Sequence, residues 1–181
     1  MLILSLISGV LLWTLVEYFL HRFAGHEAKR TNFFKTEHVQ HHAKFNYFAP
    51  ITKKVFLLAV LFVLFSALGS LIFPLLNVLL FLLGFLGMAC IYELTHFRYH
   101  SKHPVAKVFI VLRKHHFYHH FHNPKVNYGV TSRIWDRVFG TFTAVEKVNI
   151  PDKMLMGWLV EDNQLRPEYE PHFRIKKMSH E

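Results

Sequence analysis

Charged residues are missing from two long stretches of this sequence. No Lys, Arg, Asp, Glu or His occurs from residue 55 to residue 92, and before Arg22 the only such side chains are Glu17 and His21. Stretches this apolar are not expected on the surface of a soluble protein. The N-terminal stretch also lacks the basic region and the small-residue cleavage site of a signal peptide. We therefore expect a retained helix over residues 1–20.

Cysteine is almost missing as well. The single cysteine, Cys90, excludes an intramolecular disulfide and any metal site built on several thiolates. There is no internal repeat and no recognisable nucleic-acid-binding motif. We therefore attribute the net charge of +9 to the positive-inside bias of membrane proteins and to contact with anionic lipid headgroups, and we predict no nucleic-acid partner.

The remaining composition is typical of a membrane protein. Hydrophobic residues make up 52% of the 181 residues, and 19 of them are Phe. Pro74 and Asn77 interrupt the second apolar stretch, which predicts a helical hairpin with arms over residues 55–73 and 75–92. Each arm is about 27 Å long at about 1.5 Å per residue, enough to cross most of a hydrocarbon core. With the N-terminal helix, three membrane spans are expected.

The distribution of basic residues predicts the orientation. All 21 Lys and Arg lie between Arg22 and Lys54 or from Arg98 onward. By the positive-inside rule both basic segments are cytoplasmic, so the first helix crosses once and the hairpin goes out and returns. We therefore expect a multi-pass integral membrane protein of a bacterial inner membrane or the endoplasmic reticulum.

Histidine is abundant, and ten of the fifteen histidines recur at spacings typical of metal ligands. These are His21 and His26, then His38, His41 and His42, then His96 and His100, then His116, His119 and His120. Ten imidazoles are too many for one tetrahedral or octahedral ion. The sequence therefore predicts a two-metal site, on the cytoplasmic face if the orientation is right.

Helical spacing predicts how these rings converge. Residues at i, i+3 and i+4 share a face, so each H-x2-H-H motif is expected to present three imidazoles to one side. Five residues of helix turn about 500°, which leaves His21 and His26 on different faces unless the helix breaks, and Gly25 offers a break.

Two acidic residues lie next to histidine clusters at the ends of apolar segments. Glu17 and Glu93 are predicted to accept hydrogen bonds from ligand histidines, although interfacial snorkelling or a helix-end charge would also explain them. The other histidines fall outside the repeated spacings and are interpreted as exposed or as outer partners of the ligands. They are His103, His115, His122, His172 and His180.

The segment after residue 145 has a different composition. Its apolar patch, residues 154–160, is flanked by charges and predicts an interfacial helix. Beyond it, Pro167, Pro171 and a charged end predict an irregular, solvated terminus. The expected fold is an all-α integral membrane protein with about three transmembrane helices and a cytosolic helical cap, divided into a membrane-embedded domain (1–145) and a C-terminal interfacial segment with a polar tail (146–181).

Together these motifs resemble the fatty acid hydroxylase and sterol desaturase superfamily. The resemblance is carried by residues 17–22, by the H-x4-H, H-x2-H-H, H-x3-H and H-x2-H-H series, and by the run from Asn127 through Trp135 and Asp136 to Thr141. It implies a membrane oxidoreductase that uses a histidine-bound pair of iron ions to activate O2, with the ten histidines named above as ligands. Zinc is expected to be able to occupy the same ligands in purified protein.

Within the superfamily, residues 116–141 look most like fatty acid 2-hydroxylases that act on sphingolipid acyl chains. The resemblance implies a lipid substrate. Because the chain shows no fused haem domain, it also implies a separate electron-transfer protein, such as a b-type cytochrome or a ferredoxin. Relatives commonly have four spans, so the shape of the acyl channel is left open. Aromatic residues after the second cluster, Phe45, Tyr47 and Phe48, are candidates to line it or to anchor at the interface.

Other functions remain open from the sequence alone. The same chemistry serves a sterol desaturase or C-methyl oxidase, an alkylglycerol monooxygenase and a carotenoid hydroxylase. A membrane metal transporter or metal-binding protein would use histidine too. A transporter is expected to carry polar ligands within its spans, and residues 55–92 are nearly bare of them.

Overall fold

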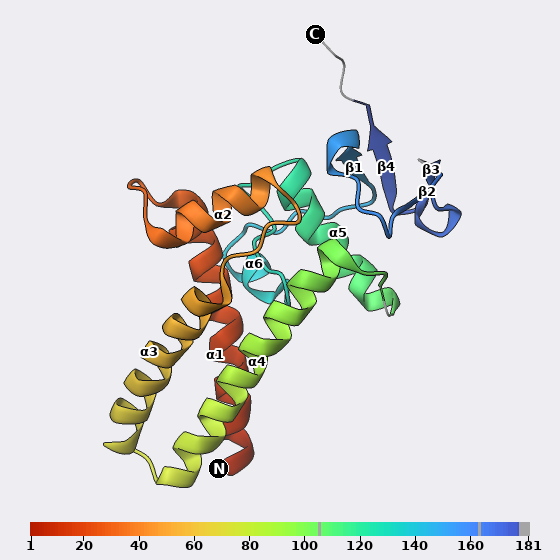
Figure 1. Ribbon diagram of the computed structural model, residues 1–181. Coiled ribbons are helices and arrows are strands. Elements are labelled where there is room, and N and C mark those ends of the chain that lie inside the picture. Colours follow the sequence, from red (N-terminus) through yellow and green to blue (C-terminus); the bar gives the residue numbers. More distant parts are fainter. Residues whose placement is uncertain (105, 163, 178–181) are drawn as a thin grey trace.

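The computed structural model describes residues 1–104, 106–162 and 164–177, with three long helices at one end of the molecule and shorter elements at the other (Figure 1). The long helices are α1 (Leu2–Phe19), α3 (Ile51–Ser70) and α4 (Leu75–Ser101). With the helical continuation of α1 to Glu27, each is long and apolar enough to cross a membrane. The three predicted spans are confirmed.

Helices α1 and α4 pack through glycines. A Cβ atom on Gly9 would lie 2.1 Å from the Phe81 carbonyl oxygen, and one on Gly84 would lie 2.2 Å from that of Leu6. Only residues without a side chain allow two helix backbones to approach this closely. Beside this crossing, the rings of Trp13 and Phe85 meet edge to face with centroids 5.2 Å apart.

The hairpin turns at Pro74, as the sequence predicts, but its second arm is longer than expected. Helix α4 begins at Leu75 and continues past Tyr92 to Ser101. Its 27 residues extend about 40 Å, more than the thickness of a hydrocarbon core. The length of α4 therefore allows the end that carries His96 and His100 to extend beyond an apolar layer of that thickness.

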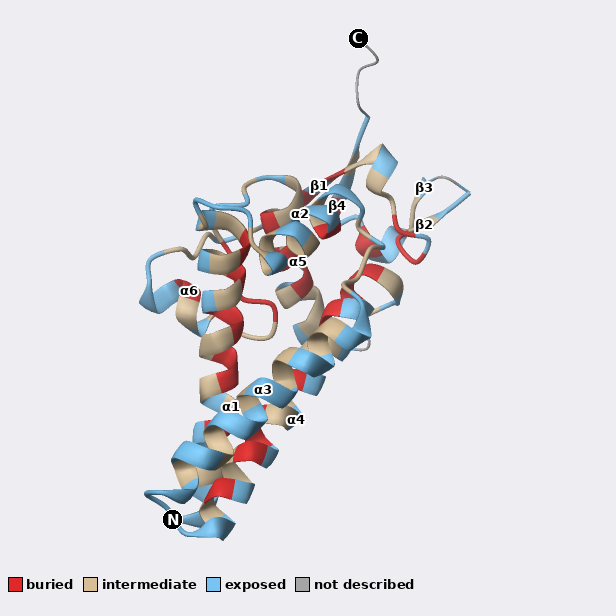
Figure 2. Cartoon of the chain, turned by 60° about the vertical axis from the view of Figure 1, so that its left-hand side comes forward, coloured by how far each residue is buried: buried red, intermediate tan, exposed pale blue. Residues whose placement is uncertain are grey.

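The cap is built from four shorter helical elements. A π-helical segment, η1 (Leu20–Glu27), continues α1, and α2 (Phe33–Ala43), α5 (Lys107–Phe121) and α6 (Ile134–Val138) follow. Buried positions gather where the cap elements meet, whereas the outer faces of the long helices are largely exposed (Figure 2). Helix α3 has no buried residue at all.

The C-terminal segment forms small sheets instead of a helix. Strand β1 (Val148–Pro151) pairs in parallel with β4 (Phe173–Lys176), and β2 (Val160–Glu161) pairs antiparallel with β3 (Gln164–Leu165). Single 3-10 turns stand at Asp152–Met154 and Pro167–Tyr169.

The predicted interfacial helix over residues 154–160 is therefore wrong, and so is the irregular terminus as far as residue 176, while residues 178–181 lie outside the described residues. Met156, Trp158 and Leu159 are buried in one core with Tyr99 and Phe117. Local composition does not show this, because the partners of these side chains come from distant helices α4 and α5. The boundary at residue 145 stays a prediction, although the segment beyond it packs into the cap.

Candidate metal centre

The ten predicted ligands gather into two groups of five. The first histidine group contains His21, His26, His38, His42 and His119, and the second contains His41, His96, His100, His116 and His120. Within each group one ring nitrogen per residue lies within 4.8 Å of all the others. The groups adjoin, because the ring of His42 stacks on that of His120 with centroids 4.0 Å apart.

The two H-x2-H-H motifs are shared between the groups, which differs from the expectation that each motif serves one side. In each motif the pair at i and i+4 joins one group and the remaining histidine joins the other. His38 and His42 belong to the first group while His41 crosses to the second. His116 and His120 belong to the second while His119 crosses to the first. Both groups therefore contain histidines from α2 and from α5.

The change to a π-helix brings His21 and His26 together. In a π-helix the hydrogen bonds run from i to i+5, so residues five apart come to the same face. The predicted convergence of these two rings is confirmed. It results from the wider π-helix and not from a break of the helix at Gly25. The absent side chain of Gly25 serves another purpose: a Cβ atom there would lie 3.0 Å from the His38 ring.

Nitrogen separations in the first group match those of ligands around one ion. The His119 Nε2 atom lies 2.9 Å from Nε2 of both His21 and His26 and 3.2 Å from that of His42. His26 and His38 approach to 2.7 Å. Two nitrogens each about 2.1 Å from a metal and at right angles would stand about 3 Å apart.

Hydrogen bonds on the opposite side of the rings fix which nitrogens carry protons. The Nδ1–H group of His21 donates to the Tyr128 carbonyl, and that of His119 donates to the Val126 carbonyl at 2.8 Å. A neutral imidazole has one N–H, so both Nε2 atoms present lone pairs to each other at 2.9 Å. Two facing lone pairs repel unless a cation lies between them, and this geometry fits a metal.

The second group holds buried nitrogen atoms without hydrogen-bond partners among the described residues. His41 donates through Nδ1 to the Tyr47 carbonyl at 2.7 Å, which leaves its Nε2 atom unpaired. The Nε2 atom of His96 and both ring nitrogens of His120 are likewise buried and unpaired. Buried polar atoms normally have a partner, and metal ligation supplies one here.

Burial also keeps the cap imidazoles neutral. Desolvation lowers the pKa of His41 to about 4 and that of His42 to about 3. The pKa values of His38, His116, His119 and His120 also fall well below the usual range, because of burial first and neighbouring histidines second. Neutral imidazole is the form that ligates metals.

The hydrogen bonds that Glu17 and Glu93 form with described residues go to groups other than the clustered histidines, and their predicted support of the ligands stays a prediction. Glu17 is buried and accepts from the backbone N–H groups of Val130 and Thr131 and from the Thr131 hydroxyl. It therefore holds the loop whose Tyr128 carbonyl orients His21. Glu93 forms an ion pair with Lys54 and is partly exposed. The partners of both carboxylates lie on other elements of the fold, so helical spacing in the sequence does not reveal them.

The remaining histidines fill supporting positions. His115 is buried and lies 2.9 Å from an Asp136 carboxylate oxygen, His103 contacts the Tyr169 hydroxyl, and His122 accepts from the Asn149 N–H. His172 is partly buried beside β4, and His180 lies outside the described residues.

Asp136 is a supporting residue whose role the sequence did not show. It is fully buried, and its two oxygens accept from the N–H groups of Tyr128 and Gly129 and from the Thr141 hydroxyl, in addition to contacting His115. In the sequence, the run from Asn127 to Thr141 stands out only as a feature of the family that it resembles. Its density of turn residues was the available signal of a structured loop.

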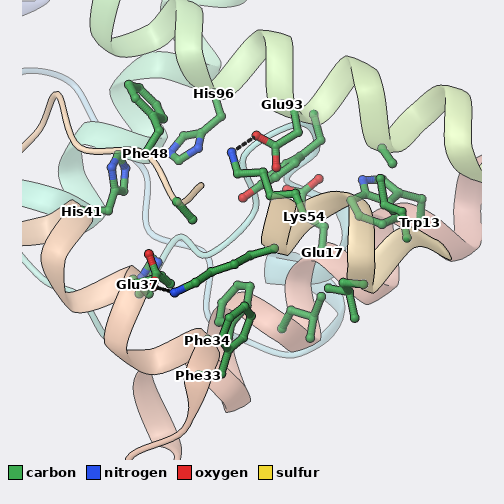
Figure 3. A pocket seen from close by; sticks show the side chains of 18 residues that line it. Trp13, Glu17, Phe33, Phe34, Glu37, His41, Phe48, Lys54, Glu93 and His96 are labelled. Atoms are coloured by element: carbon green, nitrogen blue, oxygen red, sulfur yellow. Dashed lines mark hydrogen bonds and ion pairs between the residues drawn. The ribbon is translucent and has the colours of Figure 1, made fainter. Parts of the chain in front are cut away.

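A cavity of about 120 Å³ reaches both histidine groups (Figure 3). His38 lies on its wall from the first group, and His41 and His96 from the second. Most of the lining is apolar and comes from α1 to α4, with Trp13, Leu57 and Leu58 toward the spans. Two ion pairs, Lys53 with Glu37 and Lys54 with Glu93, also line the cavity.

Of the three aromatic candidates, only Phe48 lines this cavity. Its ring lies beside those of His41 and His96, at centroid distances of 5.5 and 5.8 Å. Phe45 packs against the C-terminal core, and the Tyr47 hydroxyl donates to Glu37.

Comparison with known proteins agrees with this geometry. The chain is 34% identical to dihydroceramide fatty acyl 2-hydroxylase FAH2 of Arabidopsis thaliana, with 76% of this chain and 60% of that protein covered. It is 35% identical to ceramide very long chain fatty acid hydroxylase SCS7 of Saccharomyces cerevisiae, with 74% and 36% covered. The chain thus spans less than two thirds of the length of these relatives.

A solved structure and a family model extend the comparison. The structure titled full length scs7p, in which only the hydroxylase domain is visible, matches with a TM-score of 0.63 and 32% identity, over 78% of this chain and 57% of that one. The family model described as fatty acid hydroxylase matches residues 6–141, which include all ten clustered histidines. The chain belongs to the fatty acid hydroxylase family.

Proposed function

We propose that this protein is a membrane-bound non-haem di-iron monooxygenase that hydroxylates a fatty acyl chain at carbon 2, within a sphingolipid. The observation that carries the proposal is the cavity whose apolar wall begins between the spans and ends at both histidine groups. An acyl chain entering from the bilayer would reach the metal centre without crossing water.

The relatives support the acyl chain over other lipids. Those named above act, by their names, on fatty acyl chains of ceramide or dihydroceramide. No observation favours a sterol, an ether lipid or a carotenoid. Burial of the chain contributes binding energy of about 0.8 kcal/mol per CH2 group before the costs of association.

The number of donors supports iron over zinc. Structural zinc sites are almost always four-coordinate, whereas each group here offers five imidazoles and leaves room for one more ligand on a six-coordinate ion. When bound, the two ions would supply the oxygenation, in which O2, two electrons and two protons convert a C–H bond into C–OH and release one water.

The chain's own residues prepare this reaction. The carbonyls of Tyr128, Val126 and Tyr47 hold three imidazoles in the tautomer that directs Nε2 to the metal. Phe48 and Tyr92 place rings beside His96 at the end of the cavity, where they exclude water from the reacting carbon.

The charge distribution supports an active site on the cytoplasmic face. The basic segments 22–54 and 98–177 form the cap, while the hairpin tip at Pro74 carries no charge. Electrons would come from a separate b-type cytochrome or ferredoxin that reaches the cap from that side.

Lipid mass spectrometry of cells that produce the protein together with an electron donor tests the proposal. The double variant His119→Ala, His120→Ala removes one ligand from each group. Wild type should add one oxygen atom to acyl chains, fragmentation should place it at carbon 2, and the variant should add none.

The matched control is His172→Gln, which removes an imidazole outside both groups and should keep the product level of wild type. Oxygen added to sterols, ether lipids or carotenoids instead would refute the acyl substrate. No new product in any lipid class, at equal membrane levels and with the donor active, would refute the monooxygenase.

A further inference from the structure

Arg113 on α5 carries a buried charge that no carboxylate balances. The residue is 1% exposed, and the ion pairs of the described residues do not include it. Its guanidinium donates once, from Nη2 to the Arg98 carbonyl at 2.9 Å, while the buried Nε and Nη1 atoms have no partner. A buried cation with unused donors is costly, so a partner of negative charge is expected.

Aromatic rings compensate only part of this cost. The guanidinium carbon lies 4.1 Å from the ring centroid of Trp158 and 5.5 Å from that of Tyr99. Contacts with ring faces stabilise the charge but leave the N–H groups without acceptors. Burial lowers the pKa of Arg113 to about 10, and the nearby Arg98 acts in the same direction.

These unused donors belong to a residue that lines a second cavity, of about 260 Å³. It lies between α4, the loop after it and α5, and Arg98, Thr95 and His103 line it with Arg113. No carboxylate is among its lining residues in the described part of the chain. A neutral water molecule in this space would carry no charge to offset the buried guanidinium of Arg113.

The second cavity is separate from the metal centre. On α4, Ile91, Leu94 and Arg98 lie about 160–220° around the helix from His96, so they occupy the opposite face. Ile91 and Leu94 are exposed and apolar. They stand one to two helical turns from Arg98 toward the Pro74 end of α4.

We propose that this cavity binds the phosphate group of an anionic phospholipid. Arg98 and Arg113 would hold the phosphate, and the acyl chain would lie along Ile91 and Leu94. Arginine suits this role because its planar fork of donors matches phosphate oxygens. A lipid held here would tie the cap to the membrane surface without entering the catalytic cavity.

Native mass spectrometry of the metal-loaded protein in neutral detergent tests the proposal. The probes are phosphatidylglycerol and phosphatidylcholine with the same acyl chains. Wild type should retain phosphatidylglycerol in preference, and Arg98→Gln should reduce that retention at least tenfold. Arg113→Met should reduce the retention in the same way, but Arg113 is buried, so this variant also changes the core. Arg98 is exposed, so Arg98→Gln tests the site without changing the core.

Arg174→Gln is the matched control, because it removes an exposed arginine from β4 with the same change of charge. Its retention of phosphatidylglycerol should equal that of wild type, and all variants should keep their bound metal. Equal retention of the two lipids, or an equal loss in Arg174→Gln and Arg98→Gln, would overturn the proposal.

A second measurement separates a lipid from a soluble anion. Inorganic phosphate is added at constant ionic strength, and the unfolding temperature is followed. If phosphate shifts the unfolding temperature of wild type no more than that of Arg98→Gln, the lipid assignment is supported. A shift in wild type as large as that given by phosphatidylglycerol would overturn the lipid assignment in favour of a free phosphate.

Discussion

His119 lies at the centre of the first histidine group. Its Nε2 atom is within 3.2 Å of three other imidazole nitrogens, and its Nδ1–H is fixed by the Val126 carbonyl. The neighbouring residue His120 belongs to the other group. Adjacent residues on one helix therefore belong to different candidate metal groups.

Replacement of His119 by Gln should empty one group and spare the other. We expect the metal content to fall from about two ions to about one ion per chain, because the second group keeps its five ligands. Elemental analysis of purified protein measures this, with His172→Gln as the control. Loss of both ions would contradict two separately held metals.

Gly25 tests how closely α2 must approach η1. In Gly25→Ala the new methyl group would meet the His38 ring at 3.0 Å and displace it. We expect the affinity of the first group for metal to fall by about 10-fold or more, as it does when the support of a ligand is disturbed. Gly157→Ala adds the same methyl group where nothing lies within 4 Å, and it should leave the affinity unchanged.

At the scale of elements, the loop from residue 127 to 141 supports the first group from behind. Its Tyr128 carbonyl accepts from His21, and Asp136 and Glu17 hold its backbone. The loop contains a single short helix, α6, so few of its backbone groups are held by helical hydrogen bonds. The two buried carboxylates hold other backbone N–H groups of the loop in their place.

Asp136→Asn should therefore loosen the loop. An amide replaces one acceptor oxygen with a donor, so at least one of the N–H groups of Tyr128 and Gly129 or the His115 contact is lost. We expect a loss of about 1–3 kcal/mol in the free energy of unfolding and weaker metal binding. Denaturant titration and metal competition measure both. Asp162→Asn, at an exposed turn, should show neither effect.

The close crossing of α1 and α4 can be tested at Gly9. Gly9→Ala would place a methyl group within 2.1 Å of a backbone oxygen, so the helices must separate. We expect a destabilisation of about 1–3 kcal/mol in detergent unfolding. Gly87→Ala on α4 meets nothing within 4 Å and should be close to neutral. Equal stability of the two variants would refute the close crossing.

In the whole molecule, a metal centre held by the two histidine groups would act as a crosslink. These histidines come from η1, α2, α4 and α5. Of these elements, η1 packs against α2 and continues α1, which packs along α4. Repulsion between facing lone pairs is expected to separate these elements when no cation is bound.

Removal of metal should thus destabilise the whole cap. After chelation we expect the unfolding temperature to fall by roughly 10 °C, because ions that bind only the folded state stabilise it by mass action. Reloading with iron should restore it. A chelated protein that melts at the same temperature as the loaded one would show that the cap does not depend on the ions.

Local sequence patterns were enough to predict the three candidate spans and the ten histidines that gather in the two groups. Spans follow from hydrophobicity over about 20 residues, and ligands follow from residue type and spacing, which are both local properties. The turn at Pro74 and the start of α4 at Leu75 were predictable for the same reason.

Which histidines gather in one group depends on the tertiary packing. The exchange of His41 and His119 between the groups depends on how α2 and α5 face each other, and the convergence of His21 and His26 depends on a π-helix. The partners of Glu17, Glu93 and Asp136 are likewise distant in sequence. Helical spacing fixes the face on which a side chain lies, but packing between helices fixes what that face meets.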